Sequence, residues 1–305
     1  MLRSVSMALA AALLVLAVAA GCGKPQEEAA PAAAPKASAA PAKAPPAGST
    51  TIQAKGSDTL LQVAQALAEA YKAVEPNVSV SVTGGGTGTG FKAIIDGTCD
   101  IADASRKIKD EETAAAKEKG IDLVENLVGY DGIAVIVNKD NPIEKITIDE
   151  LASLFTAKTT DWSSLGGRGE VVILSRETTS GTYEYFKEHV LNGGDSKGKV
   201  NFAESAILLP STDQIRKQVS ETAGAVGYIG LGYLDESVKV VPIVAKDGSE
   251  VLPSVATVKD GSYPISRPLF MYTQKTAAAA VTKYIDWIKG KDAQAVVAKE
   301  GFVPL

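Results

Sequence analysis

The chain has 305 residues and a formal net charge of −5. This length allows one large domain or two medium domains with a buried core. An acidic chain is a poor candidate for sequence-independent nucleic-acid binding, and its single histidine excludes a metal site built from several histidines.

The first 21 residues have the pattern of an export signal. Arg3 supplies a positive charge, and residues 8–20 form an apolar run of signal-peptide length, too short to indicate a transmembrane helix. The small residues before Cys22 resemble a bacterial lipoprotein cleavage site, although Ala19 stands where leucine is usual. We predict that residues 1–21 are removed and that Cys22 carries a lipid; a secretory signal with an incidental cysteine is the alternative.

Residues 22–49 are rich in alanine and proline and have almost no bulky apolar side chain. Such a segment cannot bury enough apolar surface to fold, so we predict a flexible tether. A lipidated tether implies anchorage at the periplasmic or cell-surface face of a membrane. The folded part is expected to begin near residue 50.

From there on, strand and helix patterns alternate. Apolar runs predict strands at 51–55, 78–82, 101–104, 123–128, 133–137, 171–174, 225–229 and 238–244. Apolar residues at helical spacing predict helices at 60–74, 91–95, 111–119, 182–190, 215–219, 276–289 and 292–300. Thr147 and Glu150 form a capping box at the start of a further helix. This alternation favours layered α/β structure with largely parallel sheets.

Three Ser/Thr–Gly segments lie where a predicted strand ends and a helix begins: Gly56–Thr59, Gly84–Gly90 and Ser180–Thr182. Ligands of α/β sheets bind beyond the carboxyl ends of the strands. A helix N-terminus offers unpaired N–H groups and the positive end of the helix dipole, so it can bind an anion. Taken singly, three hydroxyl residues of these segments are most simply helix N-caps: Thr59, Thr87 and Ser180.

Arg176 follows the predicted strand at 171–174 and lies four residues before Ser180. A guanidinium can bind two oxygens of a phosphate through charge-assisted hydrogen bonds. Together with the three segments, Arg176 therefore suggests a cage for a tetrahedral oxyanion; a surface arginine beside Glu177 is the alternative. Arg106 occupies an equivalent strand end, where it either supplies a second cation or closes a salt bridge.

Two nucleotide-binding patterns fail on spacing, and serine-hydrolase chemistry lacks its motif. Phe91 follows Gly90 where a P-loop needs Lys, and it also occupies the third glycine position of the dinucleotide fingerprint. No Gly-x-Ser-x-Gly elbow is present, and His189 has no obvious orienting acid. We therefore predict no catalytic residue, no metal and no cofactor. A phosphoester hydrolase that uses the same cage is the alternative from another class.

Six segments together resemble the PstS-type phosphate-binding proteins of bacterial ABC importers: Gly56–Leu60, Thr87–Gly90, Asp100–Arg106, Arg176–Thr182, Gly224–Tyr228 and Tyr263–Pro268. The most specific piece is Arg-x-x-x-Ser-Gly-Thr. The resemblance implies a two-lobed, type II periplasmic-binding-protein fold, α/β with mixed or parallel sheets flanked by helices and a ligand cleft between the lobes. We expect a discontinuous lobe 1 at 50–132 plus 241–305, and lobe 2 at 133–240.

The resemblance further implies a monomer that captures inorganic phosphate and delivers it to ABC permease subunits. The implied phosphate ligands are Thr59, Leu60, Thr87, Ser105, Arg106, Arg176, Ser180, Gly181 and Thr182. Ser105 stands where some members carry the aspartate that accepts the proton of hydrogen phosphate. Asp58 is therefore the first candidate, and Asp103 the second, for the carboxylate that accepts this proton and so reads the protonation state of the ligand. Arsenate, sulfate or another oxyanion is the alternative ligand.

Overall fold

The computed structural model describes residues 50–305. The predicted signal, the tether and the lipid site at Cys22 lie outside these residues. Within the described part, none of the helices combines the length and the apolar character needed to span a membrane.

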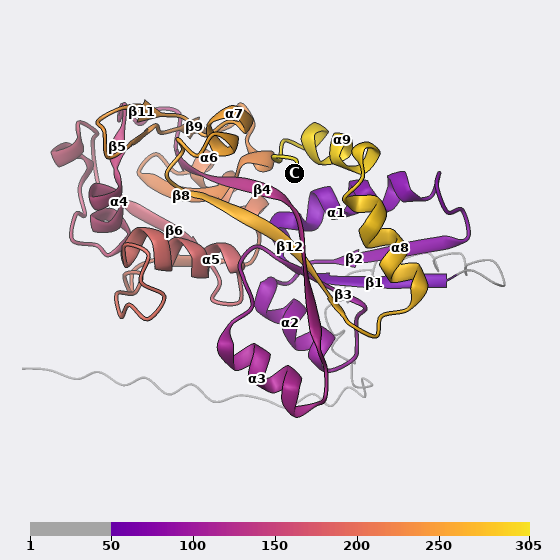
Figure 1. Cartoon of the computed structure of the whole chain (residues 1–305). Coiled ribbons are helices and arrows are strands. Elements are labelled where there is room, and N and C mark those ends of the chain that lie inside the picture. The colour runs from indigo at the N-terminus through magenta and orange to yellow at the C-terminus, as the bar shows by residue number, and fades with distance from the viewer. Residues whose placement is uncertain (1–49) are drawn as a thin grey trace, which may run out of the picture. The chain divides into compact units, whose positions relative to one another are not determined.

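The main sheet of the described residues has nine strands, in the order β2-β1-β3-β12-β4-β8-β6-β7, with β9 paired to β4 (Figure 1). Parallel pairs join β1 to β2 and β3 and join β6 to β7 and β8, whereas β12 is antiparallel to both of its neighbours. The strands are β1 (Thr50–Gly56), β2 (Val78–Thr83), β3 (Ile101–Ala104), β4 (Leu123–Val137), β6 (Val172–Arg176), β7 (Ile207–Leu209), β8 (Ala225–Gly230), β9 (Lys239–Val240) and β12 (Ser266–Gln274). A small second sheet holds β5 (Ile146–Thr147), β10 (Ile243–Val244) and β11 (Glu250–Val251).

The predicted helices are present, and several extend beyond their predicted bounds. The helices are α1 (Asp58–Tyr71), α2 (Thr87–Ile95), α3 (Asp110–Glu118), α4 (Ile148–Phe155), α5 (Gly181–Phe186), α6 (Thr212–Glu221), α7 (Val255–Lys259), α8 (Ala279–Ile288) and α9 (Lys291–Lys299). The capping box of α4 is confirmed, because Glu150 N donates to Thr147 Oγ1 over 3.2 Å and Thr147 N donates to the Glu150 carboxylate over 2.8 Å. The predicted helix at 60–74 ends earlier, at Tyr71, and Val74 is exposed.

β4 is one continuous strand of 15 residues, so the prediction of two separate strands at 123–128 and 133–137 is wrong. The glycines between the two predicted strands are required by close packing. A Cβ on Gly129 would lie 2.9 Å from the carbonyl oxygen of Val303, and one on Gly132 would lie 2.7 Å from Val258 Cγ2.

The segment 266–274, for which the sequence predicted no strand, forms the central strand β12. Leu269 and Met271 pack in the core on one face of the sheet, and Phe270 and Tyr272 pack in the core on the other. A strand that is buried on both faces shows no alternation of apolar and polar residues. Pro268 also argues against a central strand, since it cannot donate to the ladder.

The predicted strand at 238–244 is split in two at Pro242. β9 pairs with β4, whereas β10 pairs with β5 in the small sheet. Proline has no N–H with which to continue a ladder, and the Pro242 carbonyl instead accepts from Ile146 N over 3.0 Å.

The chain passes between the two lobes along β4 and again at the start of β12. β4 pairs with β12 up to Gly132 and with β8 and β9 from Ile133 onward. Residues between β9 and β12 pack in the core of the second lobe, among them Ile243 and Ile265. We therefore propose that lobe 2 extends to Ile265, in place of the predicted end at 240; below, lobe 1 means 50–132 plus 266–305 and lobe 2 means 133–265.

Asp103 is an isolated carboxyl group inside lobe 1. It lies on β3 opposite Met271 and is buried, and within residues 50–305 its Oδ1 atom has no hydrogen-bond partner. Burial raises the pKa of Asp103 to about 7. The Tyr284 hydroxyl is also buried without a partner among these residues; burial, and secondly the charge of Asp103, raise the pKa of Tyr284.

We predict that Asp103→Asn removes a pH dependence of stability. An aspartate in an unfolded chain titrates near pH ~4, so between that pH and about 7 the unfolded state is ionised while folded Asp103 keeps its proton. The stability from this group is therefore full below pH ~4 and falls with rising pH, by a few kcal/mol at about 1.4 kcal/mol per unit. Urea unfolding at pH 5 and pH 8 should show a smaller decrease in Asp103→Asn than in the wild type.

Asp122→Asn is the matched control, because Asp122 is exposed. It should keep the pH dependence of the wild type. If Asp103→Asn also keeps it, Asp103 does not fold in its protonated form.

Candidate functional site

The first and third Ser/Thr–Gly segments meet across the two lobes. The Oγ1 atoms of Thr59, on α1, and Thr182, on α5, lie 2.8 Å apart although 123 positions separate them in the chain. Both residues are buried, at 1% and 2% exposure. The expected convergence of distant helix starts is therefore present.

The second segment reaches the same place. Thr87, at the start of α2, is fully buried; its Oγ1 accepts from Ser105 N over 3.1 Å and lies 3.2 Å from Ser105 Oγ. A Cβ on Gly181 would lie 2.3 Å from Thr87 Oγ1 and 2.4 Å from Ser105 Oγ. Glycine at position 181 thus lets the start of α5 touch two hydroxyl groups of lobe 1. We call Thr59, Thr87, Ser105, Ser180, Gly181, Thr182 and Arg176 the cage.

The second segment, Gly84–Gly90, which we call the glycine loop, also contacts lobe 2 through its backbone. Gly88 N donates to the carbonyl of Thr179 over 3.1 Å. Gly86 has φ +89°, and a Cβ there would lie 2.5 Å from the same carbonyl oxygen. Both the backbone conformation and the close approach therefore require glycine at position 86.

The N-cap alternative holds for only one of the three hydroxyl residues. Ser180 Oγ accepts from Thr182 N over 3.1 Å and from Tyr183 N over 3.4 Å, so Ser180 caps α5. Thr59 and Thr87 lie inside the first turns of their helices, after Ser57 and Gly86. Their hydroxyl groups are therefore directed to contacts between segments rather than to capping.

The predicted backbone donor Leu60 is used within its own helix start. Its N–H donates to the carbonyl of Ser57 over 3.2 Å. This bond is compatible with a position near the cage, but it leaves no free donor at Leu60.

Arg176 is buried at 2% exposure, so the alternative of a surface arginine is wrong. Nη1 donates to Thr212 Oγ1 over 2.9 Å, and Nη2 donates to Asp58 Oδ2 over 2.7 Å and to the carbonyl of Pro210 over 2.8 Å. Its Nε is buried without a partner among the described residues. The guanidinium is thus fixed in place while its Nε–H is still unpaired within these residues.

Asp58 joins lobe 1 to Arg176 of lobe 2. Oδ1 accepts from Gly85 N over 2.9 Å, and Oδ2 accepts from Arg176 over 2.7 Å. Since both oxygens have protein partners, we propose that Asp58 positions the arginine and the glycine loop rather than reading a ligand proton. Within the described part of the chain, the second candidate, Asp103, forms no salt bridge with Arg176 or Arg267, whose carboxylate partners are Asp58 and Asp131.

Arg106 closes a salt bridge, which is one of its two predicted roles. Nη1 and Nη2 each lie 2.8 Å from an oxygen of Glu112. The guanidinium also stacks over Phe91, 5.3 Å from the ring centroid. Arg106 borders the cage near Gly88, but its charge is already neutralised by Glu112.

Arg267 is a cage neighbour to which the sequence analysis assigned no role. Its Nη2 donates to Thr59 Oγ1 over 3.1 Å and to Thr182 Oγ1 over 2.9 Å. The residue is 1% exposed. Its place in the segment Tyr263–Pro268 is the only sequence signal that could have indicated it.

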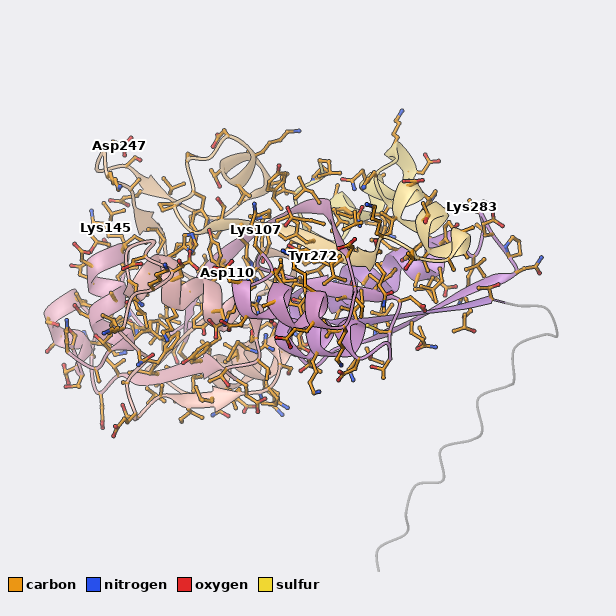
Figure 2. The ribbon with its side chains drawn as sticks, turned by 60° about the horizontal axis from the view of Figure 1, so that its bottom comes forward. Lys107, Asp110, Lys145, Asp247, Tyr272 and Lys283 are labelled. Atoms are coloured by element: carbon orange, nitrogen blue, oxygen red, sulfur yellow. The ribbon has the colours of Figure 1, made fainter. Side chains whose placement is uncertain are left out.

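A groove of about 670 Å³ lies beside the cage. Residues 106–111 of lobe 1 and 184–198 of lobe 2 form its walls, and Arg267 also lines it. Figure 2 labels Lys107 and Asp110 of the first wall. Lys109 of the first wall forms a salt bridge of 3.1 Å with Glu184 of the second, so its two walls touch in this structure.

We predict that Gly181→Ala holds the two lobes apart. The new Cβ would overlap Thr87 Oγ1 and Ser105 Oγ, both of which are buried and cannot move aside within lobe 1. The distance between spin labels placed on the two groove walls, in K107C/K197C, should be longer in Gly181→Ala than in the parent.

Gly166→Ala serves as the control, because a Cβ there meets nothing within 4 Å, although its φ of +82° adds local strain. Its label distance should equal that of the parent. An unchanged distance in Gly181→Ala would mean that lobe 1 can accommodate the methyl group without separation.

Comparison with known proteins connects this site to a family. The model of the PBP superfamily domain matches residues 41–291. Protein SphX of Synechococcus elongatus is 36% identical over 267 residues, which cover 83% of this chain and 77% of SphX. The phosphate-binding protein PstS of Pseudomonas aeruginosa is 33% identical over 276 residues, which cover 84% of each chain.

Solved structures of phosphate transport proteins also match this chain. A putative phosphate ABC transporter substrate-binding protein with bound phosphate, from Clostridium perfringens, has a TM-score of 0.76 and 31% identity, with coverage of 84% of this chain and 100% of that chain. An ABC-type phosphate transport receptor from Vibrio cholerae has a TM-score of 0.67 and 26% identity, with coverage of 83% and 100%. These matches confirm the predicted two-lobed α/β fold.

Proposed function

Because this chain belongs to the PBP superfamily and, within it, to the PstS family of phosphate-binding proteins, we propose that it binds inorganic phosphate and delivers it to an ABC permease. The protein is an extracytoplasmic solute-binding protein and acts by binding, not by covalent chemistry. The predicted resemblance is thereby confirmed, and the hydrolase alternative is set aside.

One observation carries the assignment of the binding site: buried hydroxyl groups of both lobes meet at Thr59 and Thr182, and the buried Arg176 binds Asp58, the residue before Thr59. Hydroxyl groups, backbone N–H groups and a guanidinium are the donors that bind a phosphate without a metal ion. Arg176, Thr59, Thr87, Ser105, Ser180, Gly181 and Thr182 are our proposed phosphate ligands. Leu60 and Arg106 are less suited to this role, since their donors have protein partners.

The cage must open to admit an ion. Thr59 and Thr182 are in direct contact at 2.8 Å, so a phosphate between them requires the lobes to separate. Hinge movement at the crossings in β4 and at the start of β12 would provide that separation. Binding would then replace hydroxyl–hydroxyl contacts with hydroxyl–phosphate contacts and hold the lobes around the ion.

We further propose that the mature chain is a monomer tethered by a lipid on Cys22. This proposal rests on the export pattern of residues 1–21 and the tether composition of residues 22–49. Arsenate and sulfate are the competing ligands, and the titrations below distinguish them from phosphate.

We predict that Arg176→Ala weakens phosphate binding at least 100-fold. Its guanidinium is the cage cation held from both lobes, and charge-assisted hydrogen bonds in a buried site contribute several kcal/mol. Calorimetric titration of the purified protein with phosphate measures the loss, and circular dichroism checks that the fold persists. Arg168→Ala, at an exposed arginine, should bind as the wild type does. Near-normal affinity of Arg176→Ala would remove this residue from the site.

Asp58→Asn tests which group reads the ligand proton. If Asp58 positions Arg176 and the glycine loop, the variant should bind phosphate and sulfate more weakly by similar factors, so that their affinity ratio changes less than about threefold. Titrations with phosphate, sulfate and arsenate at pH 6 and pH 8 measure the ratio. A collapse of the preference for phosphate would instead assign the proton-reading role to Asp58.

A further inference from the structure

A buried ion pair lies at the point where the chain crosses between the lobes. Arg267 of β12 and Asp131 of β4 are opposite each other in the antiparallel ladder. Arg267 Nη2 lies 3.0 Å and Nε 3.3 Å from Asp131 Oδ2, and both side chains are 0% exposed. Because the ladder fixes both backbones, the two charges are held face to face.

The same pair binds a third stretch of chain. Asp131 Oδ1 accepts from Leu231 N over 3.0 Å, just after β8 ends. A Cβ on Gly230 would lie 3.0 Å from Asp131 Oδ2, so glycine allows this close approach. Asp131 therefore connects β4, β12 and the end of β8 at the crossing.

Arg267 also reaches the cage in both lobes. Nη2 donates to Thr59 Oγ1 of lobe 1 and to Thr182 Oγ1 of lobe 2, and Nη1 donates to the carbonyl of Ser105 over 3.2 Å. The Arg267 guanidinium thus contacts Asp131, where the chain crosses between the lobes, and also the cage threonines Thr59 and Thr182.

These bonds decide which way the hydroxyl protons can point. A hydroxyl oxygen that accepts from a guanidinium must direct its own O–H elsewhere, and a threonine has only one such proton. In this structure one of the two protons serves the 2.8 Å contact between Thr59 and Thr182. With Arg267 behind them, an ion that separates the two hydroxyls can accept from both. Donors are what the acceptor oxygens of a phosphate need.

Burial makes this arrangement sensitive to geometry. Burial raises the pKa of Asp131 in spite of the nearby Arg267, and it lowers the pKa of Arg267. Such a pair is stable only while its hydrogen bonds are complete, because an unpaired buried charge is costly. A movement of the lobes that separates Thr182 from Arg267 breaks a buried contact of this pair and frees the Thr182 hydroxyl to turn.

We propose that Arg267, held by Asp131, is a positioning residue for phosphate binding: it links closure of the lobes at the crossing to the orientation of the Thr59 and Thr182 hydroxyls. It acts through these two threonines and not by contact with the ion. This inference rests on the proposed phosphate-binding function.

Arg267→Lys is the first test. Lysine keeps the charge beside Asp131, but an ammonium group on a flexible stem cannot hold Asp131, Thr59 and Thr182 at once. We expect phosphate to bind at least 10-fold more weakly by calorimetry. Addition of phosphate should also shorten the label distance in K107C/K197C less than it does with wild-type Arg267.

A double variant separates positioning from stability. Arg267→Met with Asp131→Leu replaces both charges by apolar groups of similar volume, which is often neutral for stability. We expect its melting temperature to lie close to that of the wild type while its phosphate affinity stays at least 10-fold reduced. A purely structural role would instead restore the affinity together with the stability.

Arg216→Lys is the matched control, because Arg216 contacts the carbonyl of Tyr233 and two carboxylates away from the cage. It should bind phosphate as the wild type does. Wild-type affinity in either Arg267 variant overturns the inference, and so does failure of both to fold, since the pair would then serve only the fold. If the wild-type chain itself does not bind phosphate, the proposed function fails instead.

Discussion

The structure depends on polar groups of two lobes being buried against one another. Asp58 of lobe 1 holds Arg176 of lobe 2, and Thr59 meets Thr182, all with little or no exposure to solvent. Groups of this kind are costly to bury without hydrogen-bond partners. Each lobe therefore supplies partners for the buried polar groups of the other. When the lobes separate, water molecules replace these hydrogen bonds. A phosphate ion offers a third way to satisfy them, because it can accept from several donors at once.

The local charge distribution explains how an acidic chain can attract an anion. Arg176 and Arg267 both lie at the cage, and each is paired with a carboxylate, Asp58 and Asp131 respectively. The paired charges cancel at a distance, whereas at close range the Nε–H of Arg176, unpaired within residues 50–305, remains as a donor beside Asp58. We therefore propose that oriented donors at the site, rather than the net charge of −5, control binding.

Sequence patterns predicted features that are encoded within a few neighbouring residues, but they did not predict contacts between residues far apart in the chain. Helix starts, the capping box at Thr147 and the strand end at Arg176 are each encoded within a few residues, and the structure has them within about four residues of the predicted positions. The Asp58–Arg176 pair joins positions 118 apart, and no local pattern predicts its existence. β12 escaped detection because it is buried on both faces and contains Pro268, which leaves neither alternation nor an uninterrupted apolar run.

The position of Arg267 follows from an irregularity that a sequence cannot reveal. The β4–β12 register shifts between Leu269 and Phe270, so that Val128 of β4 has no partner on β12. Without this bulge, Val128 and Asp131, three positions apart, would point to opposite faces of the sheet. With it, Val128 packs in the same core as Leu269, while Asp131 stays opposite Arg267. The bulge thus lets one strand serve the core of lobe 1 and, three residues later, fix the arginine that contacts both cage threonines.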